Sequence, residues 1–107
     1  MSQSELYVAL DVSSAEALRL GERLTGVVDG LKVGLSLYTE AGPTLVRELC
    51  GQGHRVFLDL KYHDIPHQVG LAVAKACDLG VSLLTIHTCG GREMMESAAR
   101  ASEGSAV

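Results

Sequence analysis

Short apolar runs alternate with longer amphipathic segments along the 107 residues of this chain. The apolar runs predict four strands, at residues 6–10, 31–34, 55–60 and 81–86. Apolar positions at helical spacing predict four helices, from residue 13 or 14 to about 24, from about 39 to 51, from 69 to about 80, and after Gly90-Gly91. No linker or low-complexity stretch interrupts this pattern, so we expect a single domain over residues 1–107.

The order of these elements indicates an α/β fold. Four β-α units in a row, with strands that are apolar on both faces, predict a parallel sheet. The strands recur roughly every 25 residues, which is the repeat of a (β/α)8 (TIM) barrel of about 250 residues. An open flavodoxin-like sheet would need a glycine-rich loop after the first strand, where the chain has Asp11-Val12-Ser13-Ser14. We therefore expect the N-terminal half of a (β/α)8 barrel.

Composition narrows the choice of partners and compartment. The hydrophobic fraction of 47% fits a globular protein, and a net charge of -4 gives no basic surface for nucleic acid. No apolar run is long enough to cross a bilayer and no secretory signal pattern opens the chain, so we expect no membrane partner. Cys50, Cys77 and Cys89 are odd in number and lack a C-x-x-C spacing. Buried thiols in a reducing cytoplasm are the expected state.

Charged residues gather where the predicted strands end. Asp59 and Lys61 share one face of the third strand, and opposite charges there are costly unless they pair or do chemistry. A single D-x-K pair would be read as a local ion pair. However, Asp11, Lys32 and Asp64 also lie at or just after strand ends, where barrel enzymes keep their catalytic groups. We expect the two lysines and three carboxylates to converge with nearly balanced charge.

Four segments carry a resemblance to a known family: Tyr-Val-Ala-Leu-Asp at 7–11, Leu-Lys-Val-Gly at 31–34, Asp-Leu-Lys-Tyr-His-Asp-Ile-Pro at 59–66 and Ile-His-Thr-Cys-Gly-Gly at 86–91. Together they resemble orotidine 5'-phosphate decarboxylase. The wider suprafamily shares D-x-K-x-x-D, and the Ile65-Pro66 that follows favours the orotidine enzyme. The resemblance implies conversion of orotidine 5'-phosphate to uridine 5'-phosphate in pyrimidine biosynthesis. It also implies a homodimer of full barrels with no metal or organic cofactor.

The resemblance assigns roles to individual residues. Lys61 would protonate the pyrimidine carbon as carbon dioxide leaves, and its charge would stabilise the developing carbanion. Asp59 would lie beside the substrate carboxylate and hold Lys61 in place. Lys32 would bind the ribose and complete the charged network, and Asp11 would accept hydrogen bonds from the ribose hydroxyl region.

Other assignments concern the segment after the third strand and the end of the fourth. Asp64 and Ile65 would reach into the active site of the neighbouring subunit. Gln68 stands where the family has a threonine that helps to bind ribose, and its amide can still donate and accept hydrogen bonds. His87 is a candidate substrate contact, although an internally bonded histidine explains it equally well.

Alternatives to a decarboxylase stay open at this stage. His63, His67, His87 and Cys89 match no standard zinc spacing, so we predict no metal site. The family's later strands, lid loop and phosphate-binding residues follow the segments matched here, so we expect the chain alone to be weak or inactive. It could instead be a catalytically silent half-barrel that serves association. A magnesium-dependent sugar-phosphate aldolase or decarboxylase, similar to 3-hexulose-6-phosphate synthase, is the third possibility.

Overall fold

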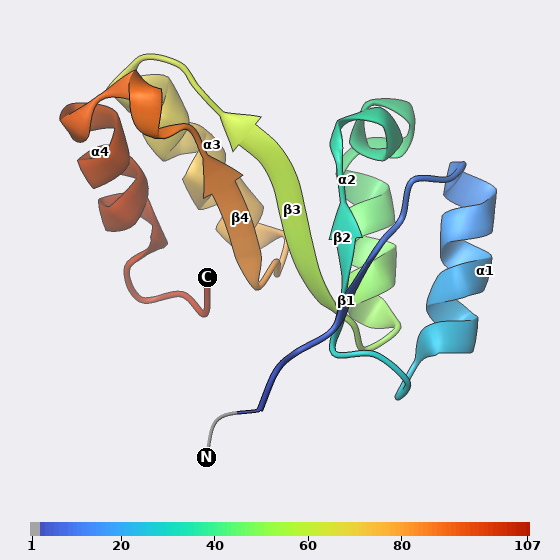
Figure 1. Cartoon of the computed structure of the whole chain (residues 1–107). Coiled ribbons are helices and arrows are strands. Elements are labelled where there is room, and N and C mark those ends of the chain that lie inside the picture. Colours follow the sequence, from blue (N-terminus) through green and yellow to red (C-terminus); the bar gives the residue numbers. More distant parts are fainter. Residues whose placement is uncertain (1–2) are drawn as a thin grey trace.

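Strands and helices alternate along the chain in the computed structural model, which describes residues 3–107 (Figure 1). The elements are β1 (Tyr7–Ala9), α1 (Ser14–Leu24), β2 (Gly30–Val33), α2 (Leu35–Gly51), β3 (Arg55–Tyr62), α3 (Pro66–Asp78), β4 (Leu83–Ile86), the 3-10 turn η1 (Thr88–Gly90) and α4 (Arg92–Ser102). The N-cap of α1 is Ser13, whose hydroxyl accepts the N–H of Glu16. The predicted order of four β-α units is confirmed.

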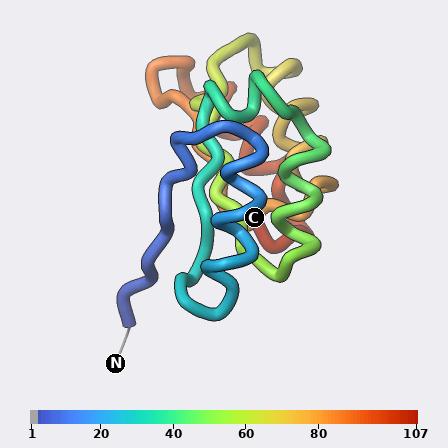
Figure 2. Tube along the Cα trace, turned by 90° about the vertical axis from the view of Figure 1, so that its right-hand side faces the viewer, coloured from blue at the N-terminus to red at the C-terminus, as the bar shows by residue number. Residues whose placement is uncertain are grey.

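The four strands form one parallel sheet in the order β1-β2-β3-β4. Figure 2 shows β1 and β2 along one side of the molecule, with α1 and α2 on the other. Strand order therefore follows chain order, as it does in a barrel wall, and β1 and β4 form the two edges of the sheet. The carboxyl ends of the parallel strands lie at the same end of the sheet, and Lys32, Asp59 and Lys61 meet near that end.

The core lies between the sheet and its helices. Strand side chains alternate between faces, and those that point toward the helices are fully buried, among them Leu31, Val33, Val56 and Leu58. The opposite face of the sheet is more open, and Leu83 on it is 42% exposed. The strands are therefore fully buried on the face that points toward the helices and more open on the other.

Helix α2 differs from its prediction. It begins at Leu35 rather than near residue 39, and it is interrupted at Gly42, which has φ 63° and ψ -158°. Pro43 explains the interruption, because a proline disfavours helical geometry in the residue before it and starts a new helical turn readily. The apolar stripe that predicted this helix belongs to its second part, where Leu45, Val46 and Leu49 are buried.

Two further expectations concern membrane-spanning helices and the burial of the cysteines. No helix within residues 3–107 is long and apolar enough to cross a membrane. The three cysteines are free thiols; Cys50 and Cys77 are half-buried, and burial raises the pKa of the Cys50 thiol. Cys89 is exposed because it lies in the η1 turn rather than in a helix or strand facing the core. The prediction of buried thiols is therefore wrong for Cys89.

Candidate active site

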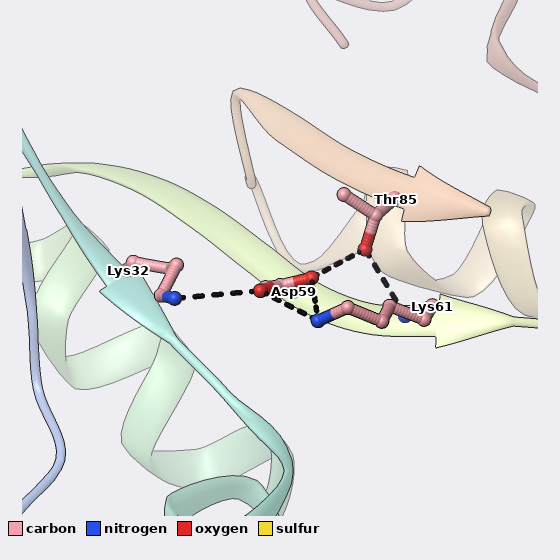
Figure 3. Close-up of polar contacts among 4 residues, drawn as sticks. All are labelled: Lys32, Asp59, Lys61 and Thr85. Atoms are coloured by element: carbon pink, nitrogen blue, oxygen red, sulfur yellow. Dashed lines mark hydrogen bonds and ion pairs between the residues drawn. The ribbon is translucent and has the colours of Figure 1, made fainter. Parts of the chain in front are cut away.

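Three neighbouring strands bring four polar side chains together near the carboxyl end of the sheet (Figure 3): Lys32 from β2, Asp59 and Lys61 from β3, and Thr85 from β4. The strand register explains this meeting. Lys32 pairs with Phe57, and Phe57 pairs with Leu83, so these three lie in one row across the sheet. Asp59 and Thr85 each follow two residues later on the same face. We call these four side chains the Asp59 cluster.

Asp59 is the centre of the cluster. Its side chain is 11% exposed, and both of its carboxylate oxygens accept hydrogen bonds from Nζ of Lys61, at 2.9 and 3.0 Å. The hydroxyl of Thr85 donates to Oδ1 at 2.7 Å. Nζ of Lys32 forms an ion pair with Oδ2 at 3.4 Å. A buried carboxylate is therefore fully supplied with donors, as buried charges require.

These partners decide the charge of the cluster. Hydrogen bonds from Lys61 and then from Thr85 lower the pKa of Asp59 and outweigh the opposing effect of burial. The carboxylate is ionised at neutral pH and faces two ammonium groups. One negative charge against two positive charges leaves the cluster cationic, so an anionic ligand is favoured there.

Lys61 has an unusual backbone. Its φ of 52° makes it the one non-glycine residue with positive φ within residues 3–107. Leu58 pairs with Leu84 and Tyr62 with Ile86, so β3 advances four residues while β4 advances two. This bulge removes the Lys61 N–H from the strand ladder, and Oγ1 of Thr85 accepts it at 3.0 Å. Left-handed geometry costs a lysine about 1–2 kcal/mol. The bulge lies in the part of β3 that extends beyond the predicted end of this strand at residue 60.

Asp11 and Asp64 do not join the Asp59 cluster. Asp11 is exposed and directly follows Leu10, whose N–H donates to the carbonyl oxygen of Lys32 at 3.0 Å. Asp64 is exposed, and its Oδ1 accepts the backbone N–H of Ile65 at 2.7 Å. The expected convergence of three carboxylates is therefore wrong within this chain: Asp59 is the carboxylate that contacts both lysines.

Ile65 and Gln68 lie where β3 gives way to α3. Ile65 precedes the first turn of α3 and is 63% exposed, an unusual position for a large apolar side chain. Gln68 is also exposed, and with Lys61 and Asp64 it lines a hollow of about 410 Å³ between β3 and α3. These residues therefore present an exposed surface beside the Asp59 cluster.

His87 lies outside the Asp59 cluster. It follows β4, and its ring stacks on that of His63 with centroids 5.2 Å apart and 27° between the planes. Its Nδ1 is 3.5 Å from Sγ of Cys89. Three of the four residues considered for a metal thus meet in space, which their spacing in sequence did not indicate.

Sequence reasoning missed Thr85. The signal was available, because Thr85 lies two residues before His87 and shares its predicted face of the fourth strand. A lone threonine in a strand is usually read as a β-former, which hides its polar role.

Relatives of known sequence identify the family of this chain. The sequence profile of the Orotidine 5'-phosphate decarboxylase / HUMPS family matches residues 4–106. The orotidine 5'-phosphate decarboxylase of Nitrosococcus oceani is 49% identical over 102 residues, covering 94% of this chain and 44% of that protein. The enzyme of the same name from Opitutus terrae is 48% identical over 100 residues, covering 92% of this chain and 44% of that protein.

A solved structure gives the same result. The crystal structure of orotidine 5'-phosphate decarboxylase from Lactobacillus acidophilus matches with a TM-score of 0.78 and 34% identity, over 92% of this chain and 45% of that chain. The chain spans less than half the length of the relatives that it matches. Fold and matches together define an α/β half of a (β/α)8 barrel. The chain belongs to the orotidine 5'-phosphate decarboxylase / HUMPS family.

Proposed function

We propose that this chain supplies the proton-donating half of an orotidine 5'-phosphate decarboxylase, which forms uridine 5'-phosphate in pyrimidine biosynthesis. The observation that carries the proposal is the Asp59 cluster, in which two ammonium groups surround one ionised carboxylate. Such a site attracts an anionic substrate and holds an acid at a fixed position, and decarboxylation with protonation at carbon needs both. The relatives matched above carry this enzyme name.

The proposed reaction needs one proton from the protein. The bond between the pyrimidine ring and its carboxylate breaks, carbon dioxide leaves, and the electron pair remains on the ring carbon. Lys61 then transfers a proton from Nζ to that carbon, forming the carbon–hydrogen bond of uridine 5'-phosphate. The neutral amine of Lys61 recovers its proton from water. Before transfer, the ammonium charge stabilises the electron pair as it develops.

Asp59 and Thr85 would position the acid rather than exchange protons. The two hydrogen bonds from Lys61 to the carboxylate fix the direction of its Nζ. The hydrogen bonds that lower the pKa of Asp59 keep it ionised, so it does not compete as a proton donor at neutral pH. The hydroxyl of Thr85 restrains Asp59 on the side that faces β4.

The remaining contacts belong to the substrate and to a second subunit. We assign Lys32 and Asp11 to the ribose, with Gln68 and His87 as further substrate contacts. We assign Asp64 and Ile65 to the active site of a neighbouring subunit in a homodimer, and their exposure on the loop before α3 supports that role. The proposed chemistry requires no metal or organic cofactor, and we expect it in the cytoplasm.

A magnesium-dependent sugar-phosphate reaction is less well supported by the same contacts. Magnesium binds through carboxylate oxygens that are free to face it. Both oxygens of Asp59 already accept hydrogen bonds from Lys61, and the ammonium of Lys32 lies 3.4 Å away. A divalent cation at this position would be repelled by both lysines.

A complementation assay tests the proposal. The 107-residue chain is mixed with the C-terminal half of the Nitrosococcus oceani relative, and uridine 5'-phosphate formed from orotidine 5'-phosphate is measured by chromatography. We expect turnover in the mixture, little with either part alone, and no change when EDTA is added. Absence of turnover by a folded complex would sink the decarboxylase proposal and favour a silent association module. Magnesium-dependent turnover of a hexulose phosphate would favour the sugar-phosphate alternative.

A further inference from the structure

Two loops place two imidazoles and a thiol together beyond the ends of β3 and β4. His63 begins the loop between β3 and α3, His87 follows β4, and Cys89 lies in η1. One ligand atom from each of the three lies within 4.8 Å of the others. All three side chains are exposed, and none of them belongs to the Asp59 cluster. A group of this composition calls for an explanation of its own.

The backbone brings His63, His87 and Cys89 together. The N–H of His87 donates to the carbonyl oxygen of Tyr62 at 2.9 Å, so the loops leave β3 and β4 side by side. Gly90 then lets the η1 turn approach, because a Cβ there would collide with the thioether of Met94 and lie 3.2 Å from Cδ2 of His63. The proximity of the ligand atoms therefore follows from strand pairing and from the space that Gly90 leaves for the side chains of Met94 and His63.

The geometry is close to that of a tetrahedral metal site. Bonds of about 2.0 Å to nitrogen and 2.3 Å to sulfur place the two ligand atoms roughly 3.5 Å apart around zinc. Nδ1 of His87 and Sγ of Cys89 are 3.5 Å apart. The widest separation in the group, up to 4.8 Å, has to close by about 1.3 Å, which exposed side chains reach by rotation. A thiol hydrogen bond would explain the pair but leaves His63 without a role.

We propose that His63, His87 and Cys89 bind one Zn²⁺ ion, with the fourth position open to water or a ligand. Two imidazoles and a thiolate are borderline-to-soft donors, which select zinc over magnesium or calcium. The bound ion would cross-link the loop that carries Asp64 to the η1 turn. This proposal revises the expectation of no metal, which considered sequence spacing alone. It involves neither Lys61 nor Asp59, so it stands whether or not the chain is a decarboxylase.

Metal titration of the reduced 107-residue chain tests the site. Calorimetry with Zn²⁺ measures stoichiometry and affinity, and Co²⁺ reports a thiolate ligand through its charge-transfer absorption. We expect one ion per chain and a thiolate–cobalt band. Cys89→Ser should abolish the band, and both Cys89→Ser and His63→Ala should weaken zinc binding by more than about tenfold, since even outer-shell changes cost that much. His87 is also assigned a substrate contact, so it is left unchanged.

Two matched variants serve as controls. Cys77→Ser removes a thiol, and His67→Ala removes an exposed imidazole near His63 in sequence, yet neither residue belongs to the group. Both controls should keep the wild-type affinity and the cobalt band. The proposal is overturned if the wild-type chain shows no thiolate–cobalt band. It is equally overturned if Cys89→Ser and His63→Ala, folded by circular dichroism, bind zinc as tightly as the controls.

Discussion

The hydroxyl of Thr85 donates a 2.7 Å hydrogen bond to Oδ1 of Asp59 across the β3–β4 pair. Oγ1 of Thr85 in turn accepts the backbone N–H of Lys61, which the bulge in β3 has removed from the ladder. Thr85 on β4 therefore holds both the carboxylate of Asp59 and the backbone of Lys61, the proposed proton donor.

Thr85→Val tests this double role, because valine keeps the shape of threonine without its hydroxyl. Asp59 loses one donor and the Lys61 N–H loses its acceptor. We expect a loss of about 1–2 kcal/mol in the free energy of unfolding, measured by urea titration. Thr85→Ser retains the hydroxyl and should recover most of that loss. Equal stability of the valine and serine variants would show that the hydroxyl contributes nothing.

The positive φ of Lys61 predicts an unusual ranking of two substitutions. Lys61→Gly and Lys61→Ala both remove the ammonium, so both lose the ion pair with Asp59. Glycine accepts φ 52° without strain, whereas alanine does not. We expect the glycine variant to be more stable in urea by about 1 kcal/mol, after allowance for its greater freedom when unfolded. In an ordinary strand the ranking would be reversed, and that result would contradict the left-handed geometry.

The lowered pKa of Asp59 predicts how stability depends on pH. The folded pKa lies below the unfolded value of about 3.9, so the contribution is fully present above that value. It is lost as pH falls from there through the folded pKa. We expect the stability advantage of the wild-type chain over Asp59→Asn to be constant near neutral pH and to shrink below about pH 4. An advantage that grows with acid would mean that folding raises this pKa.

Much of the fold could be predicted from sequence, because the spacing of apolar residues and the positions of turn residues indicate the same helices and strands. Helix α1 begins directly after its N-cap Ser13, where the helix was expected to start at residue 13 or 14, and the strand order fits the expected series of four β-α units. The start of α2 was missed because residues before Gly42 lack the buried stripe seen after Pro43. The spacing of apolar residues before Gly42 therefore does not indicate a helix there.

The site was predicted in part, for a physical reason. Asp59 and Lys61 lie two residues apart on one strand, so strand periodicity alone places them together. The contact of Thr85 with Asp59 and the meeting of His63, His87 and Cys89 depend on the pairing of β3 with β4 and on the bulge of two residues in β3. Register and bulges depend on contacts between segments distant in sequence, and a single strand pattern does not contain them.

The proton-donor role of Lys61 is tested most directly by its removal in the complemented complex. Turnover of orotidine 5'-phosphate is compared for the wild-type chain, Lys61→Ala and Lys75→Ala, each mixed with the same C-terminal half and checked for assembly by size exclusion. Lys75 is an exposed lysine on α3 and serves as the matched control. We predict that Lys61→Ala lowers turnover by at least about 10²-fold, while Lys75→Ala stays at the wild-type rate. Wild-type turnover by an assembled Lys61→Ala complex would contradict the proposed mechanism.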